Sequence, residues 1–476
     1  MKKTVCLVLL FTVFFPLLTI AGPVQLSQAE SVARRFFRSR GGANIAPTLT
    51  HQASLPSQDD RKSSVPAFYI FNFAEKGFVI VAADDRVEPV LGYSTESAFD
   101  VENIPENMQF LFNCYYSEIQ AIINDDKTKE IRKWNDWQLR GAEEVGTVTA
   151  VVGPLITSKW HQQNPYNAFC PSDGAGPGGH TLVGCGAIVM GQLLRYWHYP
   201  TSGSGTHSYN AYGYGTQSAD FEDAIYDYDN MPDALTAASS DLQINAVGTL
   251  LYHCGVSVNM NYGVNASYMN SNNMVPALTN YWKYPETIQA FDREDFSSLA
   301  WWHLIKGELD DRAPFFYGGT GSQGGHVFLC DGYDEENYVH INWGFGGGYD
   351  GYFLLTALNP GPYSFSSEQV IIIGMRGPEL PPQDTTSVSE SMDLEVSVYP
   401  NPAREQVTVI AHDCGETGLV RCTISDLAGR VILVENLETS QNALSHTFNL
   451  SHISNGIYLL AIETNKRKVI RKIIVE

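Results

Sequence analysis

The alternation of apolar and polar positions predicts a mixed α and β chain that ends in a segment made of strands alone. Up to about residue 125, apolar residues recur with helical spacing in some stretches and form short strand-like runs in others. The elements expected there are helices over Ala29–Phe37 and Met108–Ile123 and strands over Phe68–Phe73 and Phe78–Ala83. From residue 392 onward the apolar residues alternate with period two, and turn signals such as Asn455-Gly456 separate the runs. We therefore expect α+β structure followed by a small all-β sandwich.

The start of the chain has the pattern of a secretory signal. Two lysines precede an apolar stretch, Val5–Ile20, which is followed by the small residues Ala21 and Gly22. This order predicts a signal peptide over residues 1–22 that directs export. The alternative is a membrane anchor, but Pro16 and the shortness of the run argue against it, because a spanning helix needs about 20 apolar residues.

Length and charge narrow the class of protein. The chain has 476 residues, which suggests two to four domains at about 150 residues per domain. It carries 30 Lys and Arg against 52 Asp and Glu, a formal net charge of −22. A chain this acidic repels phosphate backbones, so no nucleic-acid partner is expected. Hydrophobic residues make up 44% and charged residues 17%, which excludes bulk disorder and allows packed cores.

Two polar stretches divide the chain. Residues 124–144 are rich in charge and have two interpretations, a solvated helix face or an exposed, cleavable linker. Residues 377–391 are rich in Pro and Ser, which is typical of a linker between domains. Between them, residues 146–376 are rich in Gly, Tyr, Trp and Asn and contain 7 Lys and Arg against 21 Asp and Glu. We expect this central segment to form a separate domain.

The cysteines and glycines exclude several kinds of site. Eight cysteines are present, and loss of Cys6 with the signal leaves an odd number, so at least one thiol has no partner within the chain. No CxxC pair, HExxH or zinc-finger spacing occurs, and no GxSxG elbow is present. Two GxGxxG stretches, 174–179 and 319–324, do not open a helix after a strand and are expected to be mobile loops. The sequence therefore predicts no metal and no cofactor.

Cys185 is the first candidate for chemistry. Apolar residues follow it with helical spacing, at Val189, Leu193 and Trp197, so a helix is expected to begin at or just after it. The positive end of a helix favours thiolate and lowers the pKa of a thiol placed there. The other interpretation is a cysteine that only packs at the start of a buried helix. The pattern by itself leaves both open.

A histidine that introduces a strand is the second candidate. Gly324 and Gly325 precede His326, and the missing side chains leave room for a substrate backbone. An imidazole here would take the proton of a thiol in a Cys/His arrangement. In the next strand, Asn342 and Trp343 are placed to orient or shield that imidazole. The alternative is a histidine that only packs in its strand. Four other histidines compete for the role: His180, His198, His253 and His340.

Several short motifs, taken in order, resemble the streptopain family of secreted cysteine peptidases. They are Gln162-x-Asn164-Pro165-Tyr166-Asn167, Gly184-Cys185, Gly255–Gly263, Gly325-His326, Asn342-Trp343-Gly344 and Asp350–Phe353. Together they cover most of residues 150–376. One departure is Phe345, which stands where the family usually has a second tryptophan. The resemblance implies a papain-like fold for this segment.

The same resemblance implies roles for individual residues. Cys185 corresponds to the nucleophile, and His326 corresponds to the general base and acid. Gln162, with the backbone N–H of Cys185, corresponds to the oxyanion hole. Trp343 corresponds to the residue that orients or shields the histidine, and Asn342 is a further candidate for supporting it.

Both flanking segments carry resemblances of their own. The N-terminal segment resembles the inhibitory prodomain of the streptopain family, and the C-terminal segment resembles the sorting domain of the type IX secretion system in Bacteroidetes. The motifs are residues 78–86 and 91–94 in the first, and residues 398–403, 426–430, 456–458 and 472–475 in the second. The alternatives are a permanent accessory domain and a plain β-sandwich binding module, since such sandwiches host many functions.

These resemblances imply a division of the chain into five parts. They are a signal peptide (1–22), an inhibitory prodomain (23–145), a papain-like peptidase domain (146–376), a linker (377–391) and a β-sandwich sorting domain (392–476). Maturation is expected within residues 125–150, where Lys133 and Arg140 are candidate cleavage sites.

The protein is expected to be a secreted cysteine endopeptidase, made as a zymogen, that hydrolyses protein or peptide substrates through a thioester. Its expected partners are its own prodomain, as an intramolecular inhibitor, and the type IX secretion machinery. Its expected location is outside the cell, released or attached to the outer-membrane surface after crossing the periplasm. Two alternatives stay open: a papain-like thiol amidase with a non-protein or single-partner substrate, and a catalytically silent surface adhesion or binding protein. The sequence predicts neither the substrates nor the oligomeric state.

Overall fold

A computed structural model describes most of the chain between residues 22 and 475. The described residues are 22–42, 44–55, 65–125, 134, 137, 150–321, 324–355, 369–378, 395–412, 419–426, 430–439, 443–464 and 468–475. The predicted signal peptide, nearly all of the predicted linker and the candidate cleavage sites Lys133 and Arg140 lie outside them.

The N-terminal segment combines helices with an antiparallel meander. Its elements are α1 Leu26–Ser39, β1 Thr48–Ser54, β2 Pro66–Asn72, η1 Ala74–Lys76, β3 Phe78–Ala82, β4 Val90–Ser94 and α2 Glu106–Asn124. Strands β1 to β4 pair in chain order. One face of α1 buries Ala29, Val32 and Phe36, the helical spacing from which this element was predicted. Both predicted helices and both predicted strands of this segment are confirmed.

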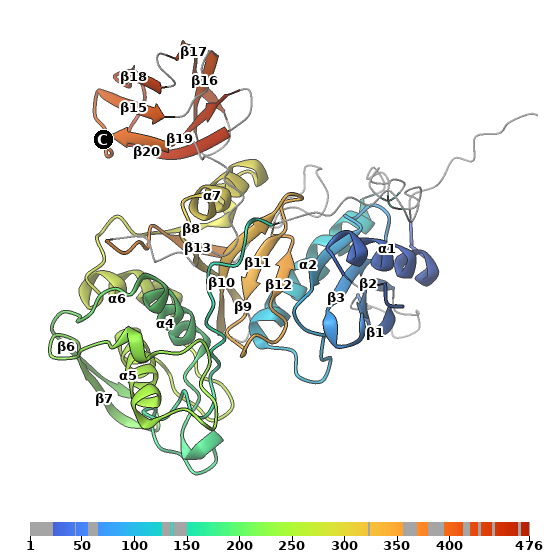
Figure 1. The fold of residues 1–476 in the computed structure, drawn as a ribbon, viewed down its shortest axis with the longest axis vertical. Coiled ribbons are helices and arrows are strands. Elements are labelled where there is room, and N and C mark those ends of the chain that lie inside the picture. The colour runs from blue at the N-terminus through green and yellow to red at the C-terminus, as the bar shows by residue number, and fades with distance from the viewer. Residues whose placement is uncertain are drawn as a thin grey trace, which may run out of the picture.

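The central segment places helices beside an antiparallel sheet. Its helices are α4 Cys185–Trp197, α5 Asp241–Ser257, α6 Met274–Asn280 and α7 Ser298–Asp310, with short 3-10 turns η2 Pro177–Gly179, η3 Tyr228–Asn230, η4 Ser271–Asn273 and η5 Arg293–Asp295. Its strands are β5 Ala150–Val152, β6 Thr206–Ala211, β7 Gly215–Asp220, β8 Gln289–Asp292, β9 Phe315–Gly321, β10 Gly324–Asp334, β11 Val339–Asn342, β12 Gly351–Phe353 and β13 Gln369–Ile373. Figure 1 shows α4, α5 and α6 to one side of the sheet and the N-terminal segment to the other.

One sheet runs through both segments. Among the described residues its strand order is β1-β2-β3-β4-β12-β11-β10-β9-β13-β8, and β5 also pairs with β10. The two segments join at β4 and β12, where Tyr93 lies opposite Tyr352 and Gly92 lies opposite Phe353. The backbones approach closely there, because a Cβ added at Gly351 would lie 2.4 Å from the carbonyl oxygen of Tyr93. The N-terminal segment therefore extends the sheet of the central segment.

At β9 and β10, two hydrophobic cores lie on opposite faces of this sheet. Successive residues of a strand point to opposite faces, so Phe328 of β10 belongs to one core while Val327 and Leu329 belong to the other. The first core also contains the buried side chains of α1, α2 and β2 to β4, and the second contains those of α4, α5 and α6. The N-terminal and central segments thus share the first of these two cores.

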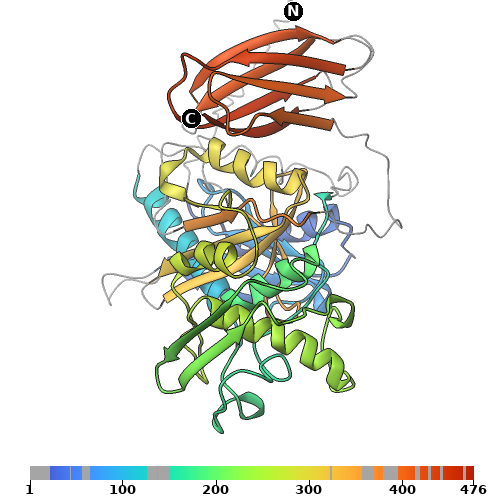
Figure 2. The same cartoon turned by 90° about the vertical axis from the view of Figure 1, so that its left-hand side faces the viewer.

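The C-terminal segment is a sandwich of two antiparallel sheets. One sheet has the order β14-β15-β18 and the other has the order β17-β16-β19-β20. Their bounds are β14 Glu395–Tyr399, β15 Gln406–His412, β16 Leu419–Asp426, β17 Val431–Glu438, β18 Ala443–Asn449, β19 Gly456–Glu463 and β20 Lys468–Val475. Figure 2 shows the sandwich stacked beyond α7, and an ion pair of 3.1 Å joins Arg471 of β20 to Asp311.

The α+β class and the C-terminal β-sandwich are confirmed, but one local prediction is wrong. Trp134 and Trp137, from the charged stretch 124–144, are helical and buried, and Trp134 Nε1 donates to the carbonyl of Val87 at 2.7 Å. Most of the stretch lies outside the described residues, so its two interpretations stay predictions. The prediction that is wrong concerns the second GxGxxG stretch. Residues 319–321 and 324, expected in a mobile loop, belong to β9 and β10.

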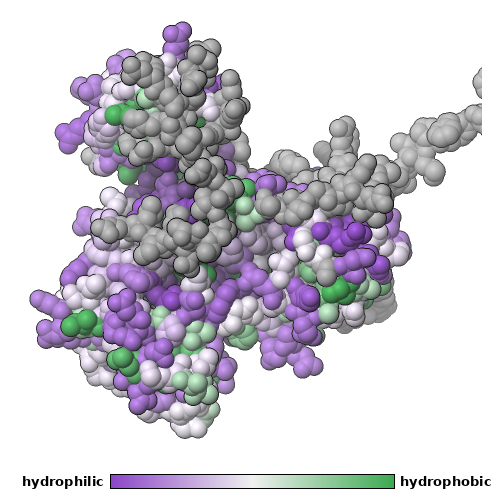
Figure 3. Space-filling model, in the orientation of Figure 1, coloured by the Kyte–Doolittle hydropathy of each residue, from purple (hydrophilic) through white to green (hydrophobic). Residues whose placement is uncertain are grey.

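The face of the molecule seen in Figure 3 is mainly hydrophilic. Figure 3 shows polar side chains over most of the described part of one face, with small and separate hydrophobic patches. Within the described ranges, no helix combines the length and the apolar character needed to cross a bilayer.

We expect Gly351→Ala to open the join between the two segments, because the new methyl group would overlap the Tyr93 carbonyl in a paired backbone. Overpacking of this kind costs roughly 1–3 kcal/mol of unfolding free energy. Thermal unfolding and hydrogen exchange at β4 and β12 measure the effect. Gly174→Ala is the control, since a Cβ there meets nothing within 4 Å. Unchanged protection of β4 and β12 in Gly351→Ala would contradict the expectation.

Candidate active site

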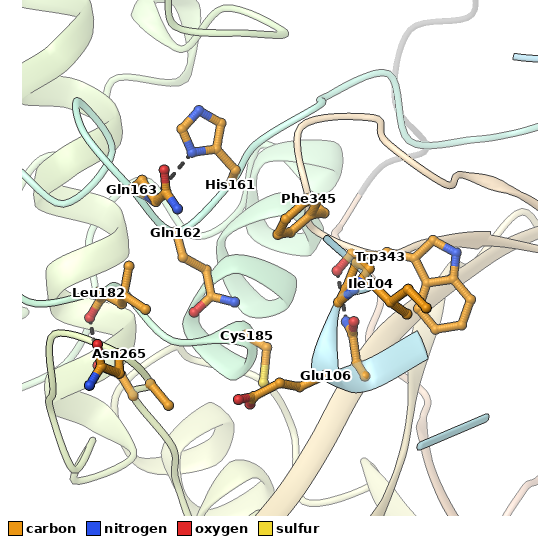
Figure 4. A pocket seen from close by; sticks show the side chains of 14 residues that line it. Ile104, Glu106, His161, Gln162, Gln163, Leu182, Cys185, Asn265, Trp343 and Phe345 are labelled. Atoms are coloured by element: carbon orange, nitrogen blue, oxygen red, sulfur yellow. Dashed lines mark hydrogen bonds between the residues drawn. The ribbon is translucent and has the colours of Figure 1, made fainter. Parts of the chain in front are cut away.

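A cavity of about 390 Å³ lies where the helical side of the central segment meets the N-terminal segment. Figure 4 shows the side chains around it. Its lining comes from both segments: Ile104, Pro105, Glu106 and Asn107 from the first, and His161, Gln162, Gln163, Leu182, Cys185, Asn265, Ala266, Ser267, Trp343 and Phe345 from the second. Three of the five residues predicted for the site, Cys185, Gln162 and Trp343, therefore line one cavity.

Cys185 is the first residue of α4, as predicted. Gly184 before it has φ +94°, a left-handed conformation that favours glycine, and a Cβ there would lie 2.7 Å from the side chain of Met260. The backbone N–H groups of Val327 and Gly186 hydrogen-bond the sulfur. Cys185 is half-buried: it packs against the second core and also lines the cavity, so it borders a space that a substrate could enter.

The pKa of the Cys185 thiol is raised, which differs from the prediction made from the helix N-terminus alone. Burial is the largest cause, and the carboxylate of Glu106 raises the pKa further. Hydrogen bonds from Val327 and Gly186 act in the opposite direction but do not reverse the balance. Glu106 belongs to the N-terminal segment, and Figure 4 shows its carboxylate beside the thiol. In this form of the chain the environment favours thiol over thiolate.

Gln162 is held so that its amide group faces the same space. Its side-chain oxygen accepts a hydrogen bond of 3.1 Å from the backbone N–H of Gly184, and its own carbonyl accepts one from Val183. Because the oxygen is engaged, the NH₂ group is the end directed toward Cys185 (Figure 4). A neutral N–H donor in this place suits an oxygen that becomes negative during attack on a carbonyl.

The backbone of His326 lies in β10, opposite Gly319 of β9. It directly precedes Val327, whose N–H reaches the sulfur of Cys185. This places the His326 backbone beside the candidate nucleophile. The side chain of His326 lies outside what the structure describes.

The four histidines that compete with His326 for the role of base contact groups other than Cys185. His180 Nδ1 lies 2.7 Å from the Cys170 carbonyl, and His253 Nδ1 lies 3.0 Å from the hydroxyl of Tyr226. His198 stacks on a tyrosine, and both ring nitrogens of His340 contact carboxylates. None of these four lines the cavity around Cys185.

His161 lines the cavity but is not among the site residues predicted from the sequence. Its Nδ1 accepts a hydrogen bond of 3.2 Å from the backbone N–H of Gln163, and burial lowers its pKa. Figure 4 shows the ring on the far side of Gln162 from the thiol. Its place directly before Gln162 in the sequence was the available signal.

Trp343 and Asn342 are both buried but have different surroundings. Trp343 Nε1 donates to the Tyr349 carbonyl at 3.0 Å, and its ring packs against Phe328. Asn342 turns away from the cavity: its amide donates to the Ser158 carbonyl, and its oxygen accepts from Gln192 at 3.2 Å. Gln192 lies on α4 and Ser158 precedes Gln162, so Asn342 ties together the elements that carry the candidate residues.

Asn107, at the start of α2, makes the direct contact between the N-terminal segment and the candidate site. Its side-chain nitrogen donates to the carbonyls of Val327 at 3.1 Å and Trp343 at 2.8 Å. The sequence pattern predicted the helix only from Met108, so Glu106 and Asn107 were not among the predicted site residues. The available signal was a polar pair at the head of an otherwise apolar helix.

Three other described cysteines lie away from the cavity. Cys170, Cys254 and Cys330 carry free thiols that are buried, and burial raises the pKa of each. An unpaired thiol is therefore not unique to Cys185, and its position at the cavity distinguishes it. In the same described ranges, no group of three or more His, Cys, Asp or Glu could hold a metal ion.

Comparison with known families finds matches in all three parts of the chain. The family described as "Peptidase C10 family" matches residues 160–353, "Spi protease inhibitor" matches residues 21–119, and "Secretion system C-terminal sorting domain" matches residues 397–476. These matches cover the central segment, the N-terminal segment and the sandwich respectively.

Three relatives illustrate the similarity. Streptopain of Streptococcus pyogenes is 32% identical over 332 residues, which are 65% of this chain and 80% of that protein. "Thiol protease/hemagglutinin PrtT" of Porphyromonas gingivalis is 29% identical over 412 residues, 79% of this chain, although the chain spans only 46% of its length. A mutant fragment of Prevotella intermedia prointerpain A has a TM-score of 0.55 at 27% identity, covering 70% of this chain and 99% of that one.

We expect Glu106→Gln to shift the pH dependence of Cys185 alkylation in the intact chain. Removing the carboxylate lowers the pKa of the thiol, so the midpoint of the rate of reaction with iodoacetamide moves to lower pH. Mass spectrometry confirms that the chain is uncut during labelling. Glu102→Gln removes an exposed carboxylate nearby in the sequence and serves as the control. Equal midpoints for Glu106→Gln and the unaltered chain would exclude Glu106 as a cause.

Proposed function

The chain belongs to the streptopain family of cysteine peptidases, peptidase family C10, and on this basis we propose that it is an endopeptidase that cleaves proteins through a Cys185–His326 dyad and is made as a zymogen. The observation that carries the proposal is the position of Cys185. It lies at the head of α4, in a cavity shared with Gln162, beside the backbone that follows His326.

The proposed reaction uses these groups in two steps. His326 accepts the proton of Cys185, and the thiolate attacks the peptide carbonyl while Gln162 and the backbone N–H of Cys185 stabilise the oxyanion. His326 then gives the proton to the leaving amine, and a thioester remains. Water, activated by the same imidazole, hydrolyses the thioester and regenerates the thiol. Trp343 shields the histidine, and Asn342 acts as a positioning residue.

Latency follows from the N-terminal segment. Asn107 and Glu106 occupy the wall of the cavity, and Glu106 opposes formation of the thiolate. The shared core and the β4–β12 pairing hold the segment in place. We propose that residues 23–145 are an inhibitory prodomain, that residues 146–376 form the peptidase domain, and that cleavage between them opens the site. The linker at 377–391 then separates the peptidase domain from the sorting domain at 392–476.

The C-terminal sorting domain indicates export through the type IX secretion system, so the protein is secreted or attached to the cell surface. We propose the secretion machinery as the partner of the sandwich, and proteins or peptides as the substrates of the mature enzyme.

We expect Cys185→Ala to abolish casein cleavage and labelling by an epoxide thiol inhibitor, because both require the thiolate. Gel analysis with N-terminal sequencing measures maturation in the same samples. A mature wild-type enzyme that keeps residue 30 would contradict the zymogen proposal. Labelling of Cys185 without cleavage of any protein would favour a thiol amidase, and neither activity after prodomain removal would favour a binding protein.

We expect Gln162→Ala to lower kcat by roughly 100- to 1,000-fold in the mature enzyme with little change in KM, because an oxyanion donor acts mainly in the transition state. Steady-state kinetics on a peptide substrate measure the effect. Gln163→Ala is the matched control, since Gln163 is an exposed amide on the same loop. A loss confined to KM would contradict the oxyanion role.

A further inference from the structure

A cluster of ionisable side chains lies outside the cavity and joins the prodomain to the peptidase domain. Glu96, just after β4, contacts His340 Nε2 at 3.0 Å through one carboxylate oxygen and Lys159 Nζ at 3.1 Å through the other. His340 and Lys159 lie on separate parts of the peptidase domain, β11 and the irregular segment before Gln162. Two cationic groups therefore converge on one carboxylate of the prodomain.

Each cation is fixed from behind by a buried carboxylate. Asp331 Oδ1 lies 2.5 Å from His340 Nδ1, and Asp350 Oδ2 lies 2.8 Å from Lys159 Nζ. Asp331 also accepts the backbone N–H of Ile156. His340, Asp331 and Asp350 are fully buried, and Glu96 and Lys159 are partly exposed. Asp331 and Asp350 therefore orient the donor groups of His340 and Lys159 independently of Glu96.

The charges are consistent with this arrangement. Burial by itself lowers the pKa of His340, but the carboxylates of Asp331 and Glu96 outweigh it and raise the pKa to about 10, so the ring is protonated and donates at both nitrogens. The hydrogen bond from His340 is the largest cause that lowers the pKa of Glu96, to about 2. Without Glu96 the peptidase domain retains two cations and two anions here, a neutral set.

We infer that His340 and Lys159 form a carboxylate-binding site of the peptidase domain, and that the carboxylate of Glu96 is its ligand and clasps the prodomain to the enzyme. Every member except Glu96 belongs to the peptidase domain. The site therefore remains formed after the prodomain is removed. The inference rests on the proposed function only in treating residues 23–145 as a removable prodomain.

The clasp lies behind the loops that carry the candidate catalytic groups. Lys159 stands three residues before Gln162. Asp350 accepts the backbone N–H of Trp343 through its other oxygen, at 3.1 Å. Release of Glu96 thus alters contacts of the two segments that hold the oxyanion donor and the shielding tryptophan. The clasp also adds to the β4–β12 pairing, because Glu96 follows β4 by two residues.

The first test measures opening of the prodomain without using peptidase activity. In the full chain carrying Cys185→Ala, which cannot cut itself, Glu96→Gln is expected to raise hydrogen exchange at β4 and β12 by roughly tenfold, since charge-assisted hydrogen bonds are lost at a partly exposed site. Exchange in α5 should not change. Glu102→Gln is the matched control. Equal exchange at β4 and β12 in Glu96→Gln and the parent chain would overturn the inference.

Chemical rescue tests whether the site recognises a carboxylate. In the Glu96→Ala chain, sodium acetate is expected to restore protection of β4 and β12, while sodium chloride at the same ionic strength is not. Restoration by acetate also shows that the Glu96→Ala chain folds, and this rescue should be lost when Lys159→Gln is added. Equal effects of acetate and chloride would overturn the carboxylate site. Because both tests read exchange rather than proteolysis, they stand or fall separately from the proposed catalytic mechanism.

Discussion

The pairing of β4 with β12 is the contact on which the rest of the structure depends. It joins two segments into one antiparallel sheet, so that the faces on either side of β10 become the floors of two cores. The prodomain side of that sheet carries α2, whose first turn reaches the cavity. The pairing therefore helps to hold Asn107 against the carbonyls of Val327 and Trp343.

In the proposed zymogen, sterics and electrostatics both act on the covered site. Asn107 and its neighbours line the cavity, and burial raises the pKa of the Cys185 thiol with a further contribution from Glu106. A helix N-terminus stabilises a thiolate only modestly, so these opposing effects decide the protonation state. Removal of one segment relieves both at once. On the proposed mechanism, the candidate nucleophile therefore stays protonated until the prodomain is removed.

Ion pairs across the interface between the prodomain and the peptidase domain are of two kinds. The peptidase segment is strongly acidic, so the prodomain docks either by supplying a cation or by reaching the few cations that the acidic domain has fixed in place. Arg40 does the first, with an ion pair of 3.3 Å to Asp334, and Glu96 does the second at Lys159 and His340. Buried ions need such partners because an uncompensated buried charge is costly. Both Arg40 and Glu96 contact two partners of opposite charge across the interface.

The sequence by itself determined what depends on neighbours along the chain. Helical spacing located the helix that begins at Cys185, alternation indicated the strands after residue 392, and motif order indicated the family and the three folded parts. The tertiary structure decided what depends on distant residues. It brought Glu106, Asn107 and Glu96 to partners far along the chain, and it reversed the expected direction of the Cys185 pKa. Local patterns report periodicity and helix ends, whereas burial and charge contacts exist only once the chain is packed.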